Sequence, residues 1–281
     1  MELVRSRPSS RVLAILGIVA CAALWGSSAP MVKQLIDTFP PCTLAALRLG
    51  IAVAVLLPVL AVQGRRPRFS REAVALGISG VAAFQLLQNF GMERMPAGTA
   101  VVTVLGASVV LTALLGWIAL GERCSIPMAL AMVGCSIGVA LVAMSGGAAV
   151  SFPVVGMLLM VAAAFAWAVY AVIGRRSPDG EMTEVMTGAL IVGLVAILPF
   201  VAWERPDTGA MSGGLSDLVM VALLGGLVTA GSYFCWSYSI QHLQANEASV
   251  LCSVEPAFGL LFAWWLLQEG ISVQEAIGAA V

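Results

Sequence analysis

The sequence predicts an all-α integral membrane protein of ten transmembrane helices, arranged as two inverted five-helix repeats with an incomplete last helix. Of the 281 residues, 60% are hydrophobic and only 10% are charged, whereas roughly a quarter are charged in an ordinary soluble domain. The charged residues cluster and leave apolar stretches of about 20 residues, the length of helix that crosses roughly 30 Å of hydrocarbon. Similarity between the two halves of the chain predicts the two repeats.

Ten apolar runs separated by polar breaks are the candidate spans. They are residues 12–36, 42–62, 73–91, 98–120, 126–144, 153–174, 182–203, 217–239, 246–267 and 272–281. The first run follows three arginines as a signal peptide would, but it is too long and continues toward Lys33, so we expect it to be retained. The last run is too short to cross a bilayer, so either this helix is incomplete or the natural chain continues beyond Val281.

Lysine and arginine positions predict the orientation, because basic loops beside a span resist translocation and stay in the cytoplasm. With the N-terminus inside, the outer loops hold only Arg94 and Arg205. The cytoplasmic ends hold Arg5, Arg7, Arg11, Arg65, Arg66, Arg68, Arg71, Arg123, Arg175 and Arg176. This imbalance favours a cytoplasmic N-terminus.

Three pairs of segments recur at about half the chain length. CAALWG around Trp25 parallels AAFAWA around Trp167, LLPVL at Pro58 parallels ILPFV at Pro199, and ALGERCS parallels LLQEGIS. The three spacings are similar, at 142, 141 and 147. Because five spans is an odd number, the second copy must enter the membrane upside down, as in many secondary transporters. We expect a first repeat over residues 1–145 and a second, inverted repeat over 150–281 that is incomplete at its C-terminus.

Several classes of function lack support in the sequence. The six cysteines lie in apolar segments without paired spacing, and there is no Walker A loop, HExxH or EF-hand pattern. We therefore expect no metal, no cofactor and no catalytic residue. The net charge of −1 says nothing about partners, but no basic patch indicates a nucleic-acid partner, so none is expected. The expected partners are the lipid bilayer and a small-molecule substrate; a monomer is compatible with the sequence, and the oligomeric state stays open.

Polar and aromatic side chains inside the spans indicate a central cavity. Gln85, Gln88 and Asn89 share one helical face of the third span, and Tyr233 and Trp236 lie in the corresponding eighth span. A polar side chain at membrane depth is costly unless it meets a partner or a water-filled cavity. Trp25 and Trp167, related by the repeat, are both past the hydrocarbon midpoint, with Tyr170 one turn from Trp167. Such a lining suits an amphipathic small molecule, although aromatic packing explains single residues equally well.

The charged residues within the spans have alternative roles. Glu255 precedes Pro256, which frees a backbone carbonyl and creates a place to bend, so its carboxyl could bind a substrate amine or a coupling proton, or be a structural acid. Arg48 is favoured as a structural residue that snorkels to the outer interface or pairs with an acid. Lys33 either attracts a carboxylate near the outer mouth or anchors the helix end.

These observations predict a site at the membrane midplane, surrounded by the first, third, fourth, sixth, eighth and ninth spans. The substrate-binding candidates are Trp25, Ser28, Gln85, Asn89, Thr103, Trp167, Tyr170, Tyr233, Trp236 and Glu255. The structural or gating candidates are Lys33, Arg48, Pro30 and Pro256.

Two other functions stay open on the residues alone. One is an intramembrane hydrolase that uses Ser108 in GASV, although the single histidine, His242, lies in a cytoplasmic turn. The other is a scaffold or receptor with a packed core. A transporter of drugs or other metabolites is a third alternative, within the transporter class.

The motifs together resemble the EamA-type proteins of the drug/metabolite transporter superfamily. The resemblance rests on ALWGSSAPMVK, PCTLAALRLGIA, GERCSIPMALAMVGCSIGVALV and ASVLCSVEPAFGLLFAWWLLQEGIS, and it covers nearly the whole chain. It implies ten helices in the inner membrane, both termini in the cytoplasm, and alternating-access transport without ATP. More narrowly, the chain resembles the YddG-like amino-acid exporters, which implies export of amino acids, aromatic ones included. Arg48, Lys33 and Glu255 with Pro256 match characteristic family positions, whereas the first repeat has Ser108 and Val109 at the equivalents of Glu255 and Pro256.

Overall fold

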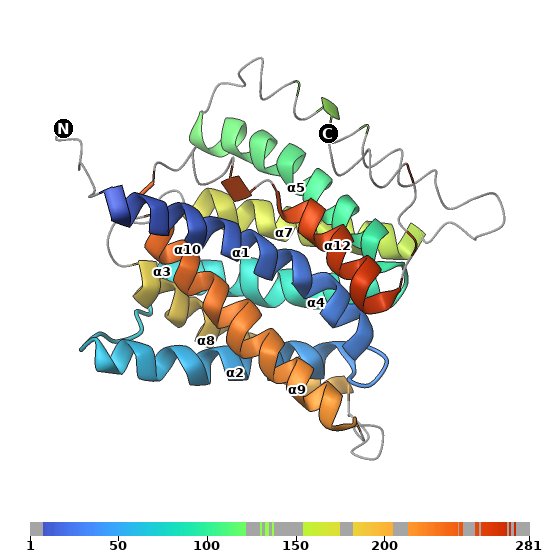
Figure 1. Cartoon of the computed structure of the whole chain (residues 1–281), viewed down its shortest axis with the longest axis horizontal. Coiled ribbons are helices and arrows are strands. Elements are labelled where there is room, and N and C mark those ends of the chain that lie inside the picture. The colour runs from blue at the N-terminus through green and yellow to red at the C-terminus, as the bar shows by residue number, and fades with distance from the viewer. Residues whose placement is uncertain are drawn as a thin grey trace.

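The structure is a computed structural model of a helical bundle. It describes residues 8–121, 130, 133, 134, 137, 154–174, 182–204, 213–240, 242, 243, 251, 252, 254–268, 270 and 273. Figure 1 shows helices that run side by side along one direction, and every described element is helical. The all-α class is therefore confirmed. The fifth and tenth predicted spans, 126–144 and 272–281, lie almost entirely outside the described residues, so the count of ten stays a prediction.

Seven of the described helices are long and apolar enough to cross a membrane. They are Ser10–Leu35, Pro41–Val62, Arg71–Met92, Thr99–Ala119, Val154–Gly174, Met182–Glu204 and Leu215–Trp236. They coincide with the first four predicted spans and with the sixth to eighth. A shorter apolar helix, Ala257–Leu267, lies in the predicted ninth span. Large apolar side chains such as Leu158 and Trp203 are exposed on these helices, as expected where lipid replaces water. The chain is a multi-pass membrane protein.

Two of the spans are built from three successive helical segments each. The continuous helices are α1 (Pro8–Leu35), α2 (Pro41–Val62), α5 (Ala97–Leu120), α7 (Val154–Gly174), α8 (Met182–Glu204) and α12 (Glu255–Leu267). The third span consists of α3 (Arg71–Leu76), η1 (Gly77–Ala83) and α4 (Phe84–Met92). The eighth consists of α9 (Leu215–Leu223), η2 (Leu224–Gly231) and α10 (Ser232–Ile240), and η1 and η2 are both π-helical.

Local chemistry explains where several helices begin and end. Pro40 and Pro41 precede and open α2, where proline costs no backbone hydrogen bond. The hydroxyl of Ser70 accepts a hydrogen bond of 3.1 Å from the amide of Ala73 and caps α3. Gly121 ends α5 at φ 66°, a left-handed conformation that favours glycine.

Helices α2 and α8 are antiparallel and are joined at both ends. Glu204, the last residue of α8, accepts hydrogen bonds from the amides of Cys42 and Thr43 at the start of α2, at 3.0 and 2.9 Å. Arg65, just after α2, forms a 3.1 Å ion pair with Glu184 at the start of α8. These two helices are counterparts in the predicted repeat, since they contain LLPVL and ILPFV, and they run in opposite directions.

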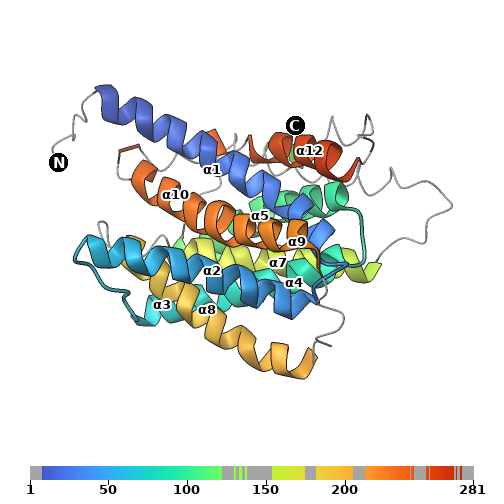
Figure 2. The ribbon, with the colours of Figure 1, turned by 60° about the horizontal axis from the view of Figure 1, so that its bottom comes forward.

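The helix contacts also occur in corresponding pairs (Figures 1 and 2). Helix α1 packs against α12, and its counterpart α7 packs against α5. Likewise α1 packs against α10 and α7 against α4, while η2 packs on α2 and η1 on α8. The π-helical segments begin at Gly77 and Leu224, which have the same spacing as ALGERCS and LLQEGIS. The predicted pseudo-two-fold relation between the halves would produce such a pattern of contacts.

We expect Glu204→Ala to lower the stability of the protein. The carboxylate of Glu204 caps two amides and the hydroxyl of Thr43, which donates to it at 2.9 Å. Losing charge-assisted hydrogen bonds at a helix start costs about 2 kcal/mol. Thermal unfolding of the purified protein in detergent should therefore show a lower Tm. Glu93→Ala is the matched control, because the exposed pair of Glu93 with Arg94 contributes little; equal Tm values for the two variants would contradict the capping role.

Candidate functional site

A cavity lies inside the bundle, between helices of both halves. Its volume is about 110 Å³, whereas one water needs about 10–15 Å³ by the same measure, so it can hold a small organic molecule. Its lining consists of Trp25, Gly26, Ser28, Ala29, Arg48, Gly80, Phe84, Gln85, Gln88, Val101, Val104, Leu105, Ser108, Trp167, Thr229, Tyr233 and Glu255. These residues come from the six spans that the sequence predicts around the site, and also from the second span.

Aromatic rings from four helices form one continuous wall. Trp25 of α1 meets Trp167 of α7 edge to face, with ring centroids 6.0 Å apart. Trp167 also contacts Phe84 of α4 at 5.3 Å and stacks on Tyr170 at 4.9 Å. On its other side Trp25 contacts Trp236 of α10 at 5.5 Å. Trp167 is thus the centre of an aromatic cluster made of these five residues, and Trp25, Phe84 and Trp167 face the cavity.

Close helix approaches bring these rings together. A Cβ atom on Gly26 would lie 2.8 Å from the backbone nitrogen of Gly259, so α1 and α12 touch at this point and Trp25 is held beside Glu255. A Cβ atom on Gly80 would overlap the side chain of Tyr170, so η1 lies directly on α7. Both contacts require glycine, because any larger residue would push the two helices apart.

The polar wall of the cavity is organised around Arg48. Its Nε donates to Oγ1 of Thr229 at 2.7 Å, and its Nη1 donates to Oε1 of Gln85 at 3.1 Å. Thr229 in turn donates to the carbonyl of Leu224, five residues back, which is the π-helical spacing. Arg48 therefore connects α2 with η2 of the second repeat and with α4 of the first. The structure places it in the cavity lining, where its guanidinium is buried rather than reaching the outer interface.

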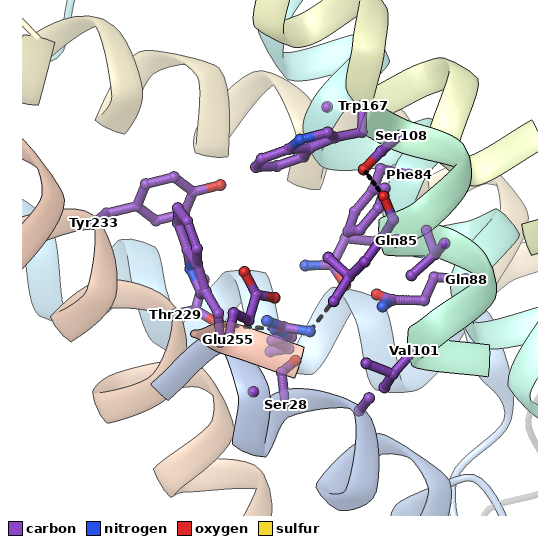
Figure 3. Close-up of a pocket in the computed structure, with 17 residues that line it drawn as sticks. Ser28, Phe84, Gln85, Gln88, Val101, Ser108, Trp167, Thr229, Tyr233 and Glu255 are labelled. Carbon is purple, nitrogen blue, oxygen red and sulfur yellow. Dashed lines mark hydrogen bonds between the residues drawn. The ribbon is translucent and has the colours of Figure 1, made fainter. Parts of the chain in front are cut away.

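Glu255 faces the same cavity from the start of α12 (Figure 3). It is the first residue of that helix, with Pro256 in the first turn and Val254 in a turn just before it. The helix α12 therefore begins at this Glu-Pro pair, and Leu251 and Cys252 shortly before it are helical as well. Positive partial charge at a helix N-terminus favours a carboxylate in the first turn. Figure 3 shows Glu255, Ser28 and Thr229 on one side of the cavity and Gln85, Gln88 and Val101 on the other, with Trp167 across one end.

Most of the predicted substrate-binding residues line the cavity. They are Trp25, Ser28, Gln85, Trp167, Tyr233 and Glu255. Tyr170 and Trp236 lie in a second layer, where their rings contact Trp167 and Trp25 respectively. The hydroxyl of Tyr170 donates to Sδ of Met186 at 3.1 Å. These two residues can therefore support the aromatic wall without being part of the lining.

Asn89 and Thr103 are predicted substrate-binding residues that each donate a hydrogen bond outside the cavity. Asn89 is buried and donates to the carbonyl of Pro41 at 2.9 Å, at the start of α2. Thr103 donates to the carbonyl of Thr99, one turn earlier in α5. Neither side chain belongs to the cavity lining, so the structure gives both of them contacts between or within helices.

The predicted structural residues also have identified places. The ammonium of Lys33 donates to the carbonyl of Met92 at 2.7 Å, at the end of α4, where a cation stabilises the helix dipole. Pro30 lies buried inside α1 and removes the N–H that would bond to the carbonyl of Gly26. Lys33 therefore joins α1 to the end of α4, and Pro30 interrupts the backbone hydrogen bonds of α1 near the cavity.

Phe84, Thr229 and Gln88 are cavity residues that the substrate-binding prediction lacks. Gln88 shares a helical face with Gln85, which was a usable signal in the sequence. Phe84 and Thr229 carried none, because apolar and hydroxyl residues are common throughout the spans.

Ser108 lines the cavity, and its hydroxyl is bonded within its own helix. Its hydroxyl donates to the carbonyl of Leu105 at 2.8 Å, inside its own helix. The cavity lining contains neither histidine nor lysine among the described residues. His242 stacks on Tyr238 at 4.5 Å, on a different segment.

Comparison with known proteins identifies relatives along the whole chain. The model of the EamA-like transporter family matches residues 12–144 and 154–281. An uncharacterized transporter of Archaeoglobus fulgidus is 26% identical over 261 residues, covering 92% of this chain and 91% of the relative. A protein of Streptantibioticus cattleyicolor named as a probable terminal-alkyne amino-acid exporter is 26% identical over 260 residues, covering 90% of this chain and 85% of the relative.

A solved crystal structure of a protein shares this fold. Its TM-score with this chain is 0.71 at 23% sequence identity, and the match covers 98% of this chain and 95% of the other. At this identity the likeness concerns the fold alone.

Proposed function

Because the chain belongs to the EamA-like transporter family, we propose that it exports small amphipathic metabolites, or lets them pass, by alternating access. Amino acids, aromatic ones included, are the proposed substrates. The relative from Streptantibioticus cattleyicolor, named as a probable amino-acid exporter, supports this substrate class. The narrower resemblance to YddG-like exporters stays a prediction.

The observation that carries the proposal is the cavity between the two halves. Three aromatic residues of the lining, Trp25, Phe84 and Trp167, offer ring faces to an apolar group. Arg48, Gln85, Gln88 and Glu255 offer charges and amides to a polar group. A molecule with one apolar and one charged end fits such a lining, since its apolar end meets aromatic rings and its charged end meets amides and groups of opposite charge.

The π-helical segments suit a rocking motion of the two halves. Each interrupts the span just before residues of the cavity: η1 precedes Phe84 and Gln85, and η2 contains Thr229 and precedes Tyr233. π-bulges weaken the regular ladder of backbone hydrogen bonds and occur frequently at functional sites. We therefore propose them as the places where the third and eighth spans bend during alternating access, with two inverted repeats exposing the site in turn.

We also propose that the protein lies in the inner membrane and that both of its termini are in the cytoplasm. The ion pair between Arg65 and Glu184 joins the end of α2 to the start of α8. In the sequence, the basic loops lie directly after α2 and directly before α8. This contact supports the placement of those loops on one side of the membrane.

Counterflow into liposomes tests the proposed function. The full chain is purified, reconstituted and loaded with unlabelled amino acid, and uptake of labelled phenylalanine, tryptophan, methionine or leucine is followed with and without a pH gradient. We expect saturable uptake of at least the aromatic amino acids, absent from liposomes without protein. No saturable flux of any amino acid would overturn the proposed substrate class, and parallel assays with drugs and nucleotide sugars would then test the wider transporter role.

A further inference from the structure

Arg48 is a buried cation without an acidic partner in the described part of the chain. Its side chain is 6% exposed, and it donates to Thr229 and Gln85, both of which are neutral. A guanidinium carries five N–H donors, so two hydrogen bonds leave several unused. Burying a charge is costly unless an opposite charge compensates it. The guanidinium faces the cavity, so an anion bound there would supply the missing charge.

Glu255 is the acidic residue on the same cavity. Among the described residues, no hydrogen bond or ion pair involves its carboxylate. Its position in the first turn of α12 favours the negative charge, but helix dipoles contribute only up to about 2 kcal/mol. A cation in the cavity would compensate this carboxylate more completely.

The two charges do not neutralise each other. Arg48 and Glu255, both within the described part of the chain, form no ion pair, although both line one cavity. They belong to different repeats, and their counterparts at the spacings of the repeat are Ala189 and Ser108, which are uncharged. The cavity therefore has one positive and one negative pole, without symmetric copies, so a bound molecule has a single charge orientation.

We propose that Arg48 binds the α-carboxylate and Glu255 the α-ammonium of a zwitterionic amino acid, while its side chain lies against Trp25, Phe84 and Trp167. This inference rests on the proposed transport function and specifies how the substrate is recognised. The structure assigns Arg48 a role in binding, in contrast to the structural role that its sequence position favours. A ligand lacking either charged group leaves one buried pole without its partner, which is the strongest way to reject an analogue.

Competition by analogues that lack one charged group tests the two poles. Counterflow of labelled phenylalanine is measured with the full chain in liposomes, against unlabelled phenylalanine, 2-phenylethylamine, which lacks the carboxylate, and 3-phenylpropanoate, which lacks the ammonium. We expect both analogues to compete at least about tenfold more weakly than phenylalanine, since an unpaired buried charge opposes binding. An analogue that competes as well as phenylalanine would contradict the binding role of the residue whose partner group the analogue lacks.

Variants assign each pole to its residue. In Arg48→Gln we expect phenylethylamine to compete as well as phenylalanine, and in Glu255→Gln we expect the same of phenylpropanoate. Arg94→Gln and Glu93→Gln, which change an exposed pair outside the cavity, should keep the wild-type order of competitors. Variants that keep the wild-type order at Arg48 or Glu255 would overturn the assignment.

A folding defect and a failed proposal give different results. If Arg48→Gln does not fold, Arg48→Lys retains the charge but loses the planar fork, and it should weaken phenylalanine competition while still rejecting phenylethylamine. Loss of that rejection in a folded Arg48→Lys protein would contradict a carboxylate pole. Wild-type protein that moves no amino acid overturns the proposed function together with this inference, whereas transport with equal competition by both analogues overturns the inference alone.

Discussion

Gly80→Ala is expected to abolish most transport and to destabilise the protein strongly. A Cβ atom at this position would overlap the ring of Tyr170 and would lie 2.6 Å from its Cβ atom. Because a Cβ atom cannot rotate away, the backbones of η1 and α7 must separate, and overpacking of this kind costs about 3 kcal/mol. The displacement would reach the substrate site directly, since Tyr170 stacks on Trp167 at 4.9 Å.

The matched control for Gly80→Ala is Gly50→Ala in α2. No atom lies within 4 Å of a Cβ atom built on Gly50, so alanine should be tolerated and should stabilise the helix by up to about 1 kcal/mol. Thermal unfolding in detergent and counterflow in liposomes are measured for both variants. If the two variants behave alike, η1 and α7 do not approach as closely as the structure has them.

Trp167→Ala is expected to reduce the transport of aromatic amino acids by about 100-fold in kcat/KM. The indole contacts Trp25, Phe84 and Tyr170 with centroid distances of 6.0, 5.3 and 4.9 Å, and it also lines the cavity. Its removal deletes a face for the substrate ring and loosens the neighbouring rings. Aromatic contacts contribute about 1 kcal/mol each beyond their buried area. The loss of two or three such contacts, counting the one with the substrate ring, corresponds to a decrease of about 100-fold in kcat/KM.

The comparison of substrates separates binding from folding in this variant. Trp167→Phe keeps a ring and should retain a large share of the flux, whereas Trp167→Ala should lose phenylalanine transport more than leucine transport. Trp203→Ala serves as the control, because Trp203 is 75% exposed on the outside of α8. An equal loss for leucine and phenylalanine in Trp167→Ala would mean that Trp167 stabilises the fold without contacting the substrate side chain.

The repeat made part of the site predictable from the sequence. Trp25 and Trp167 were paired only because they occupy equivalent places in the two copies, and the structure brings their rings into contact. The same equivalence relates α2 to α8, which the structure shows to be antiparallel neighbours. A duplicated unit keeps its packing positions, so a residue near the axis in one copy has a counterpart near the axis in the other.

The facing of individual polar residues could not be predicted in the same way. Asn89 lies one turn after Gln85 and shares its helical face, but it reaches the start of α2 and bonds to Pro41 instead of the cavity. Both residues lie in α4 after the π-helical segment η1, so they share one face and differ in height along the helix. Asn89 lies one turn further along, beside the start of α2, and the relative height of α2 and α4 cannot be read from either segment alone.

By itself, the sequence determined the solvent and the positions of most spans, and it predicted a duplication. Partition into a bilayer depends on the sum of residue hydrophobicities along a stretch of chain, and such a sum can be read without knowing any contact. Only the tertiary structure decided that Arg48 meets Thr229 and Gln85, and that it shares a cavity with Glu255. Those contacts join residues from both halves of the chain, and they depend on the rotation and height of four helices relative to one another, which no local pattern encodes.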